Sequence, residues 1–151
     1  MGFSPWGLVV AVAMLAPSLI LWVWPPRTPM PVAQVPGILV GLERVGQVLC
    51  VIVASFMPPG AVVPGWAAPM LLAIVGYYAL WARYFVRGRT AKSLYEPWWI
   101  VPAPLAIFPV VGFVSAAGWL SSPWLALSAA ILAAGHIPAS ARRSRAVLAR
   151  P

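Results

Sequence analysis

The chain has 151 residues, of which 62% are hydrophobic and 8% are charged, and its formal net charge is +8. A soluble domain usually has about 25% charged residues, so this composition excludes an ordinary water-facing surface and indicates one that faces lipid. The basic residues lie at the ends of apolar runs rather than on one polar face, which argues against a nucleic-acid partner.

The cysteine count and the first residues limit the class further. One cysteine, Cys50, excludes an internal disulfide and a multi-cysteine metal site. The residues before the first apolar run include no Lys or Arg, so we expect this run to be a retained helix and not a cleaved signal peptide.

Five apolar runs follow one another along the chain, separated by proline-rich or basic segments. A helix of about 20 residues crosses the roughly 30 Å hydrocarbon core of a membrane. The sequence therefore predicts an all-α integral membrane bundle of about five transmembrane helices in a single domain. The predicted spans are 6–24, 37–57, 66–86, 98–120 and 124–138, followed by a basic tail, 139–151.

The fourth run has three prolines in its first half, Pro102, Pro104 and Pro109. Each proline lacks a backbone donor, and its ring clashes with the preceding helical turn. The run therefore predicts a helix that is broken or kinked. One interpretation is a kinked helix packed against its neighbours. The other is a broken helix whose free backbone groups line a cavity, as in some transporters.

The positions of Lys and Arg predict an orientation, because cytoplasmic loops carry an excess of these residues. The segment from Arg87 to Lys92 and the chain after Pro138 are basic, whereas the segments 57–66 and 121–123 are uncharged. This pattern places the N-terminus outside and the C-terminus in the cytoplasm of a multi-pass membrane protein. The nine tryptophans agree, because all lie near a predicted helix end, where Trp prefers the membrane boundary.

A few polar residues lie within the predicted spans, where an ionisable side chain costs about 2.5–3.5 kcal/mol. Glu43 lies about two turns into the second span, and Gln47 follows it on the same helix face. The predicted directions of the spans bring Arg83 and His136 to the same depth, so we expect one polar cluster that opens to the cytoplasm. The candidate ligand-binding residues are Glu43, Gln47, Arg83, His136, Tyr77 and Tyr78.

These residues also have a structural interpretation. A buried pair of Glu43 with Arg83 would hold two helices in register without further function. His136 is also typical of a hydrogen-bonded histidine at a helix end. The two tyrosines are typical of core or interface positions. Two pairs of small residues have a spacing that is typical of close helix packing. They are Gly37 with Gly41 and Gly112 with Ala116.

The supply of reactive groups limits the chemistry. The only carboxylate side chains are Glu43 and Glu96, and we expect Glu96 in a loop near Lys92, where it caps the fourth span. Catalysis by paired carboxylates is therefore not expected, and one His, one Cys and one buried Glu are a poor set of zinc ligands. The sequence predicts no metal and no cofactor, and it favours a protein that is not an enzyme.

Three stretches carry a resemblance to known sequences. They are Tyr-Tyr-Ala-Leu-Trp-Ala-Arg-Tyr-Phe at 77–85, Pro-Ala-Pro-Leu-Ala-Ile-Phe-Pro at 102–109, and Gly-His at 135–136. Over its second to fifth spans, the chain resembles a group of small, uncharacterised bacterial polytopic membrane proteins. The resemblance implies a bacterial inner membrane as the location, and it implies no activity. It also implies that the polar cluster and the proline-rich fourth span occur in more than this one chain.

Three functions follow from these features. The preferred one is a protein, oligomeric by expectation, that binds or transports a small or lipid-like molecule through a cytoplasm-facing polar pocket. The second is an accessory subunit of a larger membrane complex, whose basic tail docks on anionic lipid or an acidic partner. The third is a lipid-modifying enzyme that uses His136 as a base. The expected partners are the lipid bilayer and either further copies of this chain or another membrane protein.

Overall fold

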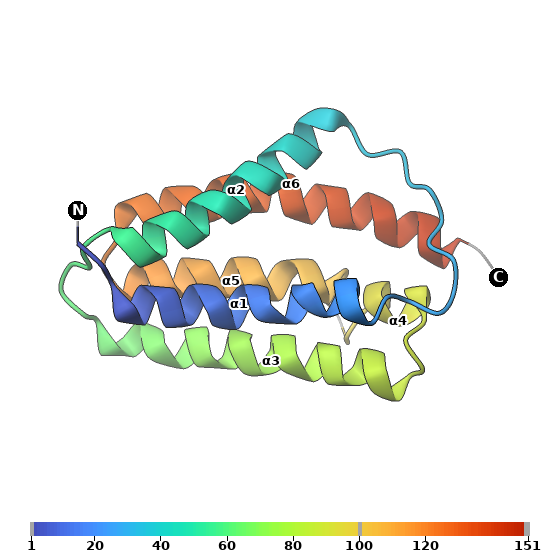
Figure 1. Ribbon diagram of the computed structural model, residues 1–151, viewed down its shortest axis with the longest axis horizontal. Coiled ribbons are helices and arrows are strands. Elements are labelled where there is room, and N and C mark those ends of the chain that lie inside the picture. Colours follow the sequence, from blue (N-terminus) through green and yellow to red (C-terminus); the bar gives the residue numbers. More distant parts are fainter. Residues whose placement is uncertain (1, 100, 150–151) are drawn as a thin grey trace.

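The computed structural model describes residues 2–99 and 101–149, and these residues form a bundle of α-helices without a β-strand. In Figure 1, α1, α5 and α3 lie lengthwise against one another, and α2 and α6 pack together above them. The two termini lie at opposite ends of the bundle. The helices are α1 (Pro5–Val23), α2 (Gly37–Phe56), α3 (Ala67–Val86), α4 (Ala91–Tyr95), α5 (Pro104–Trp119) and α6 (Pro123–Leu148), with a 3₁₀ turn at Pro64–Trp66.

The first and last helices begin with the same local signal, a serine followed by a proline. The side chain of Ser4 accepts a hydrogen bond from the backbone N–H of Gly7, and Ser122 accepts one from Leu125. Proline occupies the first helical position in both, where a backbone donor is not needed. The sequence therefore sets where both helices start.

Within the described residues, four helices are long and apolar enough to cross a membrane. They are Pro5–Val23, Gly37–Phe56, Pro64–Val86 and Pro123–Leu148, where the third includes the 3₁₀ turn before α3. The predicted all-α architecture is thus confirmed, with four of the five predicted spans at membrane length. The fifth apolar helix, α5, has 16 residues and so is about 24 Å long.

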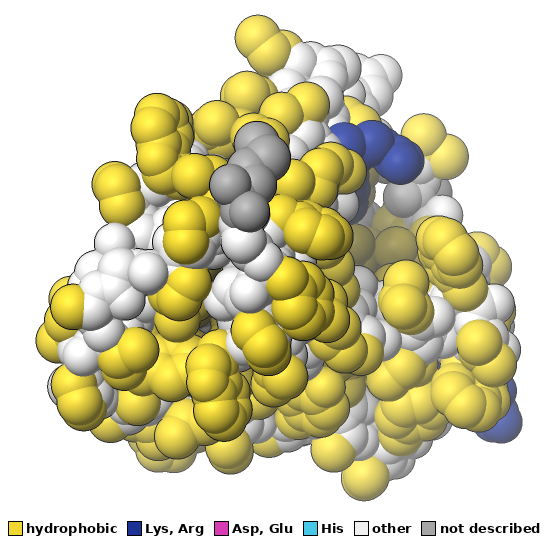
Figure 2. Space-filling model, turned by 60° about the vertical axis from the view of Figure 1, so that its left-hand side comes forward, with side chains coloured by type: hydrophobic (Ala, Val, Ile, Leu, Met, Phe, Trp, Pro, Cys, Tyr) yellow, Lys and Arg dark blue, Asp and Glu magenta, His cyan; other side chains and the backbone are white. Residues whose placement is uncertain are grey.

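Hydrophobic side chains also cover the outside of the bundle. Ile38, Leu72 and Val75 are 73%, 71% and 65% exposed. Figure 2 looks toward the end that holds the N-terminus, and nearly all side chains visible there are hydrophobic, with the few Lys and Arg atoms toward the right-hand side. An apolar surface of this extent marks contact with lipid or with another protein.

Two glycines allow α2 and α6 to approach closely. A Cβ atom at Gly46 would overlap the backbone of Leu132, and one at Gly135 would overlap the backbone of Glu43. Because backbone atoms cannot move aside as a flexible side chain can, these two positions fix the crossing of α2 over α6. The crossing lies directly beside Glu43.

The glycine pair predicted for close packing in the second span does not serve this purpose within the chain. A Cβ atom at Gly37 or Gly41 would meet no other atom. Both glycines lie in the first turns of α2, which in Figure 1 diverge from α1. The second predicted pair is packed, because Gly112 lies against the side chain of Met14 and Ala116 is buried.

The fourth span begins later than predicted. Trp98 and Val101 pair through their backbone groups, and Ala103 has a left-handed φ of 46°, so the described residues from Trp98 to Ala103 are not helical. The correction follows from the prolines, because a residue that precedes proline disfavours the helical region. From Pro104 the helix continues without interruption through Pro109. The break therefore lies before α5, not within it.

The fifth span extends beyond its predicted end. α6 has 26 residues and continues through Pro138 to Leu148, so most of the predicted basic tail is helical. Proline removes one backbone hydrogen bond, but the helical turns on both sides continue. The extension keeps Arg143 in helical register with His136, two turns earlier.

The two ends of the bundle differ in charge. At the end that holds the N-terminus, uncharged loops meet where the backbone N–H of Gly60 donates to Leu120. At the other end, the backbone N–H of Arg27 donates to Arg89 and joins two basic loops. The loops that the sequence assigns to one side of a membrane therefore share one end of the bundle (Figure 1).

Candidate functional site

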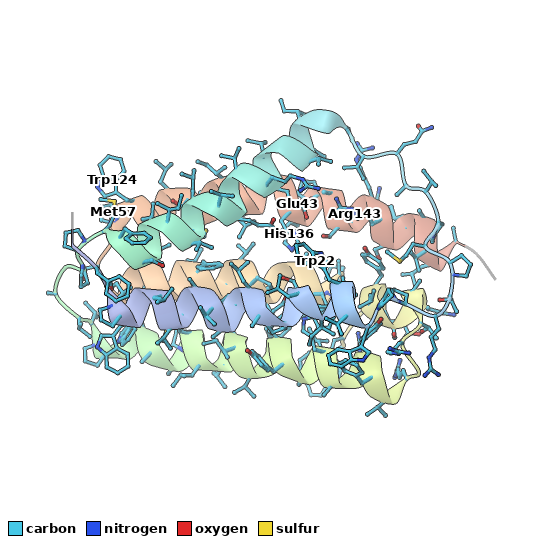
Figure 3. The ribbon with its side chains drawn as sticks, viewed as in Figure 1. Trp22, Glu43, Met57, Trp124, His136 and Arg143 are labelled. Carbon is cyan, nitrogen blue, oxygen red and sulfur yellow. The ribbon has the colours of Figure 1, made fainter. Side chains whose placement is uncertain are left out.

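Glu43 lies at the centre of the polar residues inside the bundle. Its Oε1 atom is 2.7 Å from Nδ1 of His136, and Arg143 donates to both carboxylate oxygens, at 3.1 Å and 2.9 Å. Figure 3 shows the three side chains together in the half of the bundle nearer the C-terminus. An ionised carboxylate only accepts hydrogen bonds, so Nδ1 of His136 carries a proton and the ring orientation is fixed.

The helical spacing of α6 brings its polar residues to one side. His136, Ser140 and Arg143 are separated by four and three residues, so they share a helix face. All three line the same cavity. Sequence reasoning missed Arg143 because it ended the fifth span at Pro138. The spacing from His136 was the available signal, and it counts only if the helix continues through the proline.

Arg83 does not join Glu43, and that part of the predicted cluster is wrong. Its Nη2 atom donates to the backbone oxygens of Glu96, at 2.9 Å, and of Ser93, at 3.4 Å. α3 packs on α5, whereas α2 packs on α6 and α1, so equal depth does not bring Arg83 and Glu43 together. Arg83 instead fixes the C-terminal end of the short helix α4.

Glu96 lies near Lys92, as predicted, because its backbone N–H donates to the backbone oxygen of Lys92. Its carboxylate pairs with Arg87, at the end of α3. It does not cap the fourth helix, because α5 begins only at Pro104. The Arg87 side chain is 54% exposed, so this ion pair is a surface contact between loops.

The remaining candidate residues divide between the inside and the outside of the bundle. Gln47 lines the cavity one turn after Glu43, and Tyr77 lines it from α3 with 4% of its surface exposed. Tyr78 is 45% exposed and is not part of the cavity wall. Of the six predicted residues and Arg143, five therefore line one cavity. Arg83 and Tyr78 lie apart from it.

This space is a cavity of about 210 Å³ to which all six α-helices contribute. Met14, Phe113 and Leu132 form part of its apolar wall, and Glu43 and His136 stand on the polar side. An apolar cavity of about 150 Å³ holds a benzene-sized molecule, so the volume suffices for a small ligand or for part of a lipid.

The start of α5 forms another part of the wall. Ala103, Leu105, Ala106 and Pro109 all line the cavity. The delayed start of the helix, which the prolines cause, thus leaves non-helical backbone beside the space. Of the two interpretations of the proline-rich span, a cavity bordered by its break agrees better with this arrangement.

Several polar groups of the wall have no hydrogen-bond partner among the described residues. Trp81 is 4% exposed, and its indole N–H is buried and unpaired. Nε2 of His136 makes no hydrogen bond, since Glu43 engages only Nδ1. Burial raises the pKa of the Tyr95 phenol, which also lines the cavity, so the phenol stays protonated and able to donate. A buried Trp N–H usually has a partner, so Trp81 and Tyr95 indicate a ligand with hydrogen-bond acceptors, whereas Nε2 of a neutral His136 ring that has its proton on Nδ1 accepts a hydrogen bond.

The arrangement limits what the site can do chemically. Glu43 and Arg143 neutralise each other, so the cavity has little net charge when His136 is neutral. Ser128 donates to the backbone of Trp124 and is not paired with His136. Within residues 2–99 and 101–149, no group of three or more His, Cys, Asp and Glu side chains lies together to hold a metal ion. The groups present can bind and orient a molecule through hydrogen bonds.

Comparisons with family models, curated proteins and solved structures show no match to this chain. The resemblance noted at residues 77–85, 102–109 and 135–136 therefore stays a prediction. The functional argument rests on the residues of the chain itself.

Proposed function

We propose that the chain is a polytopic protein of the bacterial inner membrane that binds or transports a small or lipid-like molecule in the cavity between its helices. The observation that carries the proposal is the cavity itself, whose largely apolar wall contains the buried, unpaired indole N–H of Trp81 beside the polar group around Glu43. An ion pair that served only as a clamp between α2 and α6 would not require an open space beside it.

In this proposal, α5 is the fifth membrane-crossing segment, and the non-helical residues before it complete the crossing. Four longer helices and a hydrophobic outer surface support a membrane location. Non-helical backbone is tolerated at membrane depth where it borders protein or a cavity, and Ala103 does line the cavity.

The proposed orientation has the end with the C-terminus in the cytoplasm. The basic loops that meet at Arg27 and Arg89 support it, because cytoplasmic loops are enriched in Lys and Arg. Cys50 is fully buried, so we expect its thiol not to react with an impermeant reagent. The labelling of a single introduced cysteine then shows on which side of the membrane that cysteine lies. A cysteine at Ala61 is expected to react with an impermeant reagent in intact cells, and one at Arg89 only after permeabilisation. The reverse pattern would contradict the orientation.

The binding proposal assigns a role to each polar residue. Glu43 holds His136 in one tautomer and leaves Nε2 directed away from the ion pair, while Arg143 compensates the charge of Glu43. His136 and Trp81 then supply the hydrogen bonds to the ligand, and the apolar wall holds its remainder. Binding energy comes from burial of the apolar part, and the polar groups select the ligand.

Native mass spectrometry of the protein released from native-lipid nanodiscs tests the binding proposal, because it gives subunit count and retained molecules together. We expect a reproducible retained molecule in the wild type and its loss in Glu43→Gln. Glu96→Gln is the matched control, since it removes the only other carboxylate, which lies outside the cavity wall. A stoichiometric complex with a different protein and no retained molecule would instead favour an accessory subunit.

A further inference from the structure

The cavity has an opening to the outside of the bundle between α1 and α2. A second hollow, of about 350 Å³, lies between these helices and shares five residues with the cavity wall. The shared residues are Leu15, Ser18, Glu43, Gln47 and Arg143. The two spaces therefore adjoin, and the hollow leads from the apolar outer surface to the polar cluster.

The packing of α1 on α2 explains why the opening lies there. Near the N-terminus the two helices are in contact, because the backbone N–H of Ser4 donates to Ser55 at 2.8 Å and Gly7 abuts the backbone of Ala54. From this contact α2 diverges from α1 toward its own N-terminal end (Figure 1). The opening thus lies in the half of the bundle that holds Glu43, beside Trp22 at the end of α1 (Figure 3).

The charge of this opening is not balanced by the chain. Its wall contains one carboxylate, Glu43, and two guanidinium groups, Arg44 and Arg143, a net charge of +1. Both acidic side chains of the protein are already engaged, Glu43 by Arg143 and Glu96 by Arg87. Arg44 forms no ion pair among the described residues.

The position of Arg44 makes an external anion the expected partner. It lies seven residues after the start of α2, an apolar helix of membrane length, so it is about 10 Å along the helix axis. An arginine at such depth is normally paired or reaches toward the interface. Leu19, Trp22 and Val40 form an apolar part of the rim. A molecule that matches both features has an anionic head and an apolar chain.

We propose that the site takes an anionic lipid from the membrane through the gap between α1 and α2. The headgroup binds at Arg44, and the acyl chain, with its ester oxygen as the hydrogen-bond acceptor for Trp81, passes Leu15 into the cavity beside Met14. This inference rests on the proposed binding function and names its ligand class and its path. Binding involves no covalent step.

The test uses nanodiscs of phosphatidylcholine alone or of phosphatidylcholine with phosphatidylglycerol, followed by native mass spectrometry. We expect one phosphatidylglycerol molecule to be retained per chain in the mixed discs. Arg44→Gln should lower retention about tenfold, because it removes a charged hydrogen bond to phosphate. Ser18→Trp should abolish retention by filling the passage.

Two controls change equivalent groups outside the passage. Val12→Trp adds the same bulk to an exposed position of α1, and Arg145→Gln removes an exposed arginine from α6. Both should leave retention unchanged. Glycerol phosphate, added as a soluble headgroup, should not displace the lipid, and displacement would show that a free phosphate compound is the ligand and overturn the lipid proposal.

The remaining outcomes separate the two proposals. A retained molecule that is neutral, or whose retention is unaffected by Arg44→Gln and Ser18→Trp, overturns the anionic lipid and its path and leaves the binding function standing. Absence of a retained molecule from the wild type in native-lipid and both defined nanodiscs overturns both.

Discussion

Toward the end that holds the N-terminus, the helices pack closely around buried apolar residues, whereas toward the other end they enclose a cavity and a group of charged residues. Ala54, Ala116, Leu125 and Ala129 belong to the closely packed region and are at most 3% exposed. Glu43 and its two partners belong to the other. Both regions are built from the same helices α1, α2, α5 and α6.

The difference between the two regions comes from a few local features. Ser-Pro starts and small residues permit close packing at one end, while the divergence of α2 and the late start of α5 prevent it at the other. Buried polar groups rarely lie beside empty space without a role. The comparison therefore assigns stability mainly to the closely packed region, and our proposal assigns binding to the open one.

The largest expected effect comes from breaking the contact that joins the two regions, the crossing of α2 over α6. Gly46→Ala should destabilise the protein by about 3 kcal/mol, the upper part of the range for overpacking, because the added methyl group meets the backbone of Leu132. Gly41→Ala in the same helix adds its methyl group in open space, so it should stabilise by up to about 1 kcal/mol. Unfolding of both variants in detergent measures the difference, and equal effects would contradict the packing at Gly46.

The next effect concerns the ion pair of the open region. Glu43→Gln and Arg143→Gln should each cost about 1–3 kcal/mol, because the first leaves the partly buried Arg143 without its carboxylate and the second leaves the buried Glu43 with His136 alone among the described residues. The double variant should cost less than the sum of the two. Arg87→Gln, which removes the exposed pair with Glu96, should cost less than about 1 kcal/mol. Strict additivity of the Glu43 and Arg143 variants would show that the pair is not formed.

A smaller effect is expected at the edge of the open region, where Arg83 fixes α4. Arg83→Gln removes hydrogen bonds to the backbone of Ser93 and Glu96 and should cost about 1–2 kcal/mol. Hydrogen exchange should rise in residues 91–97 and stay unchanged in α2. If exchange rose around Glu43 instead, Arg83 would belong to the polar cluster after all.

The smallest effects test the closely packed region. Ser4→Ala removes the cap of α1 and should cost about 1 kcal/mol. Ser55→Ala removes a buried hydroxyl that has no partner among the described residues, so it should be neutral or slightly stabilising. Thermal denaturation of the two variants gives the sign of each change in stability. A clear loss of stability in Ser55→Ala would reveal a hydrogen bond at that hydroxyl.

The sequence was sufficient for the features that depend on one helix at a time. Apolar length predicted the four long helices, and helical spacing placed Gln47 on the face of Glu43. The direction of each span predicted that His136 would lie at the depth of Glu43, and the two are in contact.

The sequence was not sufficient where neighbouring helices decide the outcome. Depth alone did not reveal that α3 packs away from α2, which is why Arg83 was assigned to the wrong cluster. The effect of a proline depends on its surroundings, since helix α6 continues through Pro138 whereas the prolines of the fourth span delay its start. Arg143 was missed for this reason.

Two substitutions in one helix test the contrast between the regions most directly. Ala106 and Ala116 both lie on α5 and are almost fully buried, but only Ala106 lines the cavity. Ala106→Leu should fold with unchanged or higher stability and lose the retained molecule, because its side chain fills the cavity. Ala116→Leu should lose stability by about 1–3 kcal/mol through overpacking. If Ala106→Leu destabilised the protein as much as Ala116→Leu, or kept the retained molecule, the cavity would not be the binding site.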